Sequence, residues 1–73
     1  MGYHAQVTAA AQSLGLLNAA GELIALDSLA VADFVVALED SVGTRIPMLA
    51  LTEQAFSSID SVARMLEDVV TAA

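Results

Sequence analysis

The chain has 73 residues, which is enough for one small domain but not for a second hydrophobic core. Lys and Arg together number 2 against 9 Asp and Glu residues, so the formal net charge is −7. Binding of nucleic acid needs clusters of Lys and Arg against the phosphates, and we therefore exclude it. A protein partner of this acidic surface should itself be basic.

Cysteine is absent, which excludes disulfides and thiolate metal sites. The single histidine, His4, and the absence of lysine leave few ways to pair a nucleophile with a base. The carboxylates are spread out and do not have the spacing of a calcium loop. We therefore expect neither an enzyme nor a metal site, and no catalytic residue.

The first 21 residues contain no Asp, Glu, Lys or Arg, which is about the length of a membrane-spanning helix. Polar residues such as Gln6, Gln12 and Asn18 interrupt this stretch, and no basic flank precedes it. A signal peptide needs a positive start and a compact apolar block. The sequence therefore predicts a cytoplasmic protein with no membrane segment, which we expect to be a monomer.

The predicted elements are all helices. Apolar residues at helical spacing predict a first helix over about 4–14, ended by Gly15, and Asn18 and Gly21 predict turns in the loop that follows. A second helix is expected over 28–42, because Gly43 ends it and Pro47 prevents its resumption. Its expected core face holds Val31, Phe34, Val35, Leu38 and Val42.

The segment 45–56 reads as irregular, with a short helix expected at about 52–55. The last helix is expected over about 58–70, with Ser57 and Asp60 at capping-box spacing. Its expected core stripe contains Ile59, Val62, Ala63, Leu66, Val69 and Val70. The fold class is therefore all-α: one domain over 1–73, a small bundle of three main helices plus one short helix.

The face of the second helix opposite its core stripe mixes apolar and acidic side chains. Leu29 and Val36 lie there with Asp33, Glu39 and Asp40. One interpretation is a solvated face with two isolated aliphatic residues, which monomers commonly have. The other is a docking strip, in which the apolar residues contact a partner and the acids attract its basic side chains.

Two chemical roles are open for Asp27 and Ser28 at the start of this helix. Either residue can be the N-cap, which stabilises a helix by about 0.5–2 kcal/mol. A serine hydroxyl at a helix N-terminus also suits attachment of a phosphate, because the helix dipole and the free N–H groups favour negative charge there.

The run Leu26-Asp27-Ser28-Leu29 resembles the modification motif of the acyl carrier protein family. Ala37-Leu38-Glu39-Asp40 resembles the Ala-Leu-Glu-Glu segment of that family, and Ile46-Pro47 follows at the family's spacing. Leu14-Gly15 and Ser57-Ser58-Ile59 resemble the end of its first helix and the start of its last. The resemblance spans nearly the whole chain, and its specific part is 27–47.

The resemblance implies that a phosphopantetheinyl transferase attaches 4′-phosphopantetheine from coenzyme A to Ser28, with Asp27 helping to present the serine. Acyl groups would be carried as thioesters on this arm to acyl-loading, condensing or modifying enzymes with basic docking patches. The resemblance also implies docking roles for the second helix: Leu29 and Val36 would enter apolar pockets, and Asp33, Glu39 and Asp40 would meet Arg and Lys side chains. The core of the bundle would shelter the acyl chain.

Five features depart from the family pattern, one of them a segment between Pro47 and the last helix that is about two residues longer than usual. Ala25 replaces a common Gly, Ala30 and Arg45 replace common acids, and the loop before the motif is short. These departures favour a carrier for a specialised polyketide or fatty-acid-like pathway. Two alternatives remain: a peptidyl or aminoacyl carrier, and an unmodified acidic helical module that binds a basic protein.

Overall fold

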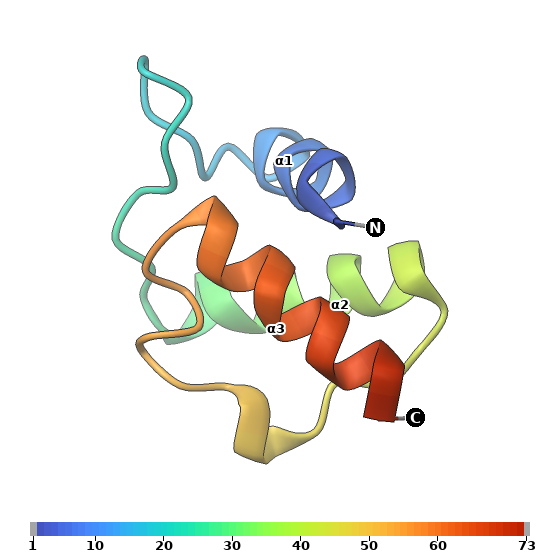
Figure 1. Ribbon diagram of the computed structural model, residues 1–73. Coiled ribbons are helices and arrows are strands. Elements are labelled where there is room, and N and C mark those ends of the chain that lie inside the picture. Colours follow the sequence, from blue (N-terminus) through green and yellow to red (C-terminus); the bar gives the residue numbers. More distant parts are fainter. Residues whose placement is uncertain (1, 73) are drawn as a thin grey trace.

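The computed structural model describes residues 2–72 and is a small all-α bundle (Figure 1). Its elements are α1 (His4–Ser13), α2 (Ser28–Val42), a short 3-10 helix η1 (Met48–Ala50) and α3 (Ile59–Ala72). The helix α1 packs against both α2 and α3. The predicted fold class is confirmed, and the bounds of the three main helices agree with the sequence prediction to within two residues.

Gly15 ends α1 as the sequence predicts. Its φ of 72° lies in the left-handed region, which glycine adopts without steric cost. Its N–H donates to the carbonyl of Gln12, and the N–H of Leu16 donates to the carbonyl of Ala11. These two bonds form a Schellman motif, which satisfies carbonyls that the helix end would otherwise leave unpaired.

The loop between α1 and α2 is organised by Asn18, whose Oδ1 accepts hydrogen bonds from the N–H groups of Ala20 and Glu22, both at 2.9 Å. Leu17 and Leu23 then face each other in an isolated antiparallel bridge. Both of these leucines pack against the core, so the loop covers the bundle while its tip extends away from the helices (Figure 1).

The short helix lies at 48–50, not at the expected 52–55. Pro47 has φ −66° and precedes it directly, which suits the start of a helical turn because proline has no N–H to satisfy. At the expected position the chain makes a turn instead. There Thr52 Oγ1 accepts from the N–H of Ala55, and this side-chain bond replaces a continued helix.

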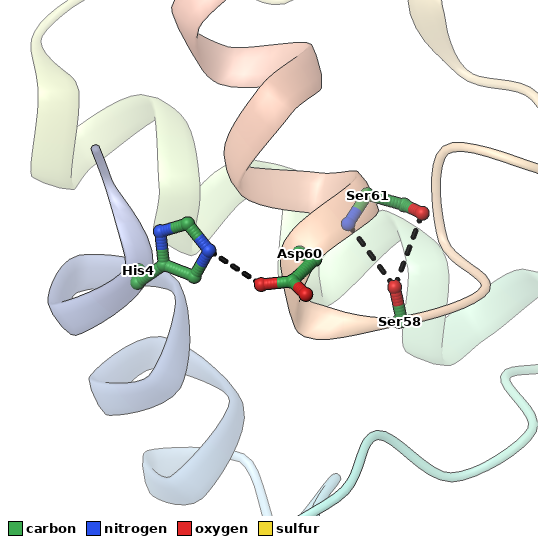
Figure 2. A network of polar contacts seen from close by, with 4 residues as sticks. All are labelled: His4, Ser58, Asp60 and Ser61. Atoms are coloured by element: carbon green, nitrogen blue, oxygen red, sulfur yellow. Dashed lines mark hydrogen bonds and ion pairs between the residues drawn. The ribbon is translucent and has the colours of Figure 1, made fainter. Parts of the chain in front are cut away.

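The N-cap of α3 is Ser58 and not the expected Ser57. The hydroxyl of Ser58 accepts a hydrogen bond from the N–H of Ser61 at 3.1 Å, whereas the hydroxyl of Ser57 donates to the carbonyl of Gln54. Asp60 therefore makes no capping box with Ser57. Its carboxylate instead lies 2.5 Å from Nε2 of His4. Figure 2 shows this contact between the two side chains. This exposed contact joins the first turns of α1 and α3 and contributes at most about 1 kcal/mol.

Side chains from all three helices form one hydrophobic core. Phe34 and Leu38 of α2 are fully buried, and the ring of Phe34 lies 6.0 Å from that of Phe56. The largest fully buried side chains are those of Val7, Phe34, Leu38, Val62 and Leu66. Most of the expected core positions are therefore confirmed.

Several core positions differ from the expectation. Leu14, one of the apolar residues whose helical spacing predicted the first helix, is 39% exposed because the helix ends before it. Five expected core residues are only half-buried: Val35, Val42 and Ile59 pack against the edge of the core, whereas Val31 and Val70 lie outside the core cluster. Met65 is buried, although the predicted stripe omitted it.

Within residues 2–72, no helix is both long enough and apolar enough to cross a lipid bilayer.

Candidate modification site and docking surface

Ser28 is the first residue of α2 and is exposed. The N-cap is its neighbour Asp27, whose Oδ1 accepts from the N–H of Ala30 at 2.8 Å. The Ser28 hydroxyl forms no hydrogen bond with any other residue of the described range 2–72. Of the two roles that the sequence left open, helix capping thus belongs to Asp27, and the serine hydroxyl is accessible.

The backbone around Ser28 favours a negative charge. The first hydrogen bonds of α2 use the N–H groups of Ala30 and Val31, both of which donate to Asp27. The N–H groups of Ser28 and Leu29 precede them and are among the first-turn donors that a helix leaves unpaired. Together with the helix dipole, such donors stabilise a phosphate at this end. A phosphodiester on the Ser28 oxygen therefore fits these residues.

Four of the five expected docking residues lie exposed on one face of α2. Leu29 is 78% exposed and Val36 is 58% exposed, and the carboxylates of Asp33 and Asp40 are exposed as well. Their positions recur every three or four residues, so they form one stripe along the helix. We call Leu29, Asp33, Val36 and Asp40 the docking strip. No Lys or Arg lies on α2, so the only charges of the strip are its two carboxylates.

Glu39 is not part of this exposed strip. Its side chain is half-buried, and Oε2 accepts a hydrogen bond from the backbone N–H of Ile46 at 2.7 Å. Its carbonyl oxygen also accepts from the N–H of Gly43. The fifth expected docking residue therefore holds the segment that follows α2.

Two exposed apolar residues on η1 were not predicted from the sequence. Met48 is 85% exposed and Leu49 is 94% exposed. With Leu29 and Val36 they are the most exposed large apolar side chains of the described residues, and all four lie on α2 or η1. Pro47 was the signal in the sequence that could have indicated their exposure, because a proline directly before this apolar pair makes the chain turn there.

An apolar depression of about 340 Å³ lies beside the start of α2. Leu26 and Val31, which precede and follow Ser28 in the sequence, line this depression. Leu51 and Phe56, from the segment after η1, line it as well. Phe56, which lines this depression, packs against the core, and its ring lies 6.0 Å from the buried ring of Phe34. The depression thus reaches the edge of the core.

Among the described residues, no group of three His, Cys, Asp or Glu side chains lies close enough to hold a metal ion. Comparison with protein-family models, with curated proteins and with solved structures gave no match for this chain.

Proposed function

We propose that this protein is a cytoplasmic acyl carrier protein that bears a 4′-phosphopantetheine arm on Ser28 and presents acyl intermediates to the enzymes of a specialised polyketide or fatty-acid-like pathway. The observation that carries the proposal is the exposed Ser28 hydroxyl at the start of α2, with the capping role taken by Asp27. The resemblance of 27–47 to the carrier family supports it independently.

In the attachment reaction, the Ser28 oxygen forms a bond to the phosphorus of coenzyme A that carries the pantetheine, and the adenosine bisphosphate half leaves. We assign the base that takes the hydroxyl proton to the transferase. The chain is therefore the substrate of the reaction and not its enzyme. When attached, the arm supplies a thiol that holds acyl groups as thioesters.

The docking strip supports binding to basic enzymes. Leu29 and Val36 offer apolar contacts, while Asp33 and Asp40 attract Arg and Lys side chains of the partner. Charges at the rim of an interface mainly accelerate association and are weakened by salt. A carrier that must leave each enzyme quickly benefits from such an interface.

The test is the intact mass of the protein before and after incubation with coenzyme A and a broad-specificity phosphopantetheinyl transferase. We expect one added arm on the wild-type chain and none on Ser28→Ala. A Ser41→Ala variant is the matched control, because Ser41 is an exposed serine of the same helix and should leave the labelling intact.

A wild-type chain that folds but gains no mass contradicts the proposal and favours the unmodified interaction module. Labelling that persists in Ser28→Ala contradicts the site. If the arm is attached, loading with acyl and aminoacyl donors separates an acyl carrier from a peptidyl or aminoacyl carrier.

A further inference from the structure

A groove of about 370 Å³ is lined by residues of η1, of the turn that follows it and of α3, and by no residue of α2. Met65 and Val69 of α3 line it and are buried. Leu49 of η1 lines it as well, yet its side chain is 94% exposed. One surface of the protein thus carries both an apolar hollow and a projecting apolar side chain.

Two opposite charges line the same groove. Arg64 and Asp68 lie about one turn apart on α3, and both side chains are exposed. Within residues 2–72 the only ion pair is that of His4 with Asp60, so Arg64 and Asp68 are not paired with each other. A base that precedes an acid by four residues is the less favourable order for a pair within one helix. Both charges are therefore available to a molecule that enters the groove.

The pair of charges restricts which partner fits. A strongly acidic partner is repelled by Asp68 and by the net charge of −7, and a strongly basic partner is repelled by Arg64. A second copy of the chain carries one charge of each sign in its own groove. Across a two-fold axis, each residue of one copy contacts the residue that contacts its own equivalent. Arg64 of each copy can then meet Asp68 of the other, and Leu49 of each copy can fill the other's hollow.

We propose that the protein forms a weak two-fold dimer through this groove, with reciprocal insertion of Leu49 and reciprocal pairing of Arg64 with Asp68. The inference does not depend on the proposed function, because no residue of α2 lines the groove. One hollow and one projecting leucine per copy make a smaller contact than the roughly 800 Å² per partner of a stable complex. We therefore expect a Kd of about 100 μM, with a monomer in dilute solution and a dimer at high concentration.

Sedimentation equilibrium of the full chain tests the dimer. In about 0.15 M salt the screening length is about 8 Å, which limits the repulsion between two acidic chains. We expect the average mass to be close to that of one chain at about 10 μM and to approach that of two chains at about 1 mM. A mass that remains that of one chain over this whole range would overturn the dimer, whether or not the protein is a carrier.

The two neighbouring apolar residues of η1 test the surface that is used. Leu49 lines the groove, whereas Met48 is 85% exposed and does not line it. We expect Leu49→Ala to raise the Kd of the dimer at least about tenfold and Met48→Ala to change it less than about twofold. Both side chains are exposed, so both variants should fold, which circular dichroism checks. Equal effects of the two variants would overturn the groove as the contact surface.

Exchange of charges tests the pairing between copies. Arg64→Asp and Asp68→Arg should each raise the Kd at least about tenfold, because each brings like charges together. Arg45→Asp makes the same change of charge as Arg64→Asp at an exposed position outside the groove and should have a much smaller effect. An equal effect of these two variants would indicate a dependence on net charge alone and would overturn the pairing.

A mixture of the two groove variants gives the most direct result. In equal amounts, Arg64→Asp and Asp68→Arg should associate as heterodimers with a Kd close to that of the wild type, because every facing pair then has opposite charges. Each variant alone should remain a monomer at the same total concentration. A mixture that associates no better than its components would overturn the reciprocal contact of Arg64 with Asp68.

Discussion

The Asp27 carboxylate accepts a hydrogen bond from the N–H of Ala30 at 2.8 Å. This bond assigns helix capping to one residue and leaves the hydroxyl of the next residue, Ser28, exposed at the same helix end. The two adjacent side chains can therefore be removed separately. Removal of Asp27 tests the contribution of the cap to stability, and removal of Ser28 tests attachment of the arm.

We expect Asp27→Ala to lower the free energy of unfolding by about 0.5–2 kcal/mol, because the cap is lost. Ser28→Ala should change it by no more than about 0.5 kcal/mol, because the exposed hydroxyl contributes no capping bond. Urea denaturation followed by circular dichroism measures both values. Asp27→Asn is the control, since asparagine also caps helices. A larger loss in Ser28→Ala than in Asp27→Ala would show that the serine is the cap.

The sequence predicted α2 closely because its limits are encoded by local chemistry. Asp27 has the side chain of an N-cap, and Gly43 adopts the left-handed conformation, with φ 70°, that glycine favours. The exposure of Leu29 and Val36 follows from helical periodicity alone. Local signals of this kind are present in the sequence itself.

Other features depend on contacts between distant residues and could not be predicted. Ser57 and Ser58 are adjacent serines with similar local surroundings, and the path of the chain after the turn at 53–56 decides which of them caps α3. The wheel of α2 placed Glu39 with the exposed acids. Only the return of the chain to Ile46 gives its carboxylate a backbone partner.

Charge reversal on the docking strip should weaken transferase docking. We expect Asp33→Arg to raise KM about 3–10-fold at low salt, because it replaces attraction to basic side chains by repulsion. The effect should shrink in about 0.5 M salt, where the screening length is only a few ångströms. Initial rates of arm attachment at both salt concentrations provide the measurement.

The matched control for Asp33 is Asp68→Arg, which makes the same change of charge at an exposed position of α3. It should have a much smaller effect on KM, because it does not lie on α2. Equal effects of the two variants would indicate a dependence on net charge alone and would argue against a defined docking strip.

Two leucines at opposite extremes of burial test the core. Leu66 is fully buried on α3 and Leu49 is 94% exposed on η1. We expect Leu66→Ala to cost about 2–5 kcal/mol, which is much of the stability of a small domain. Leu49→Ala should cost no more than about 0.5 kcal/mol. Denaturant midpoints give both values, and Leu66→Met, with a loss below about 1.5 kcal/mol, shows whether the site tolerates a change of shape. Similar losses at both leucines would contradict the described core.

Gly43 tests the backbone conformation at the end of α2. Its φ is 70°, and a Cβ added there would have no atom within 4 Å, so a side chain meets strain but no clash. We therefore expect Gly43→Ala to lower the free energy of unfolding by about 1–2 kcal/mol. A D-alanine at position 43, introduced by chemical synthesis, favours the left-handed region and should leave the stability equal to or above that of the wild type. Equal losses with both alanine enantiomers would indicate a steric conflict, and no loss with L-alanine would indicate that α2 ends in another conformation.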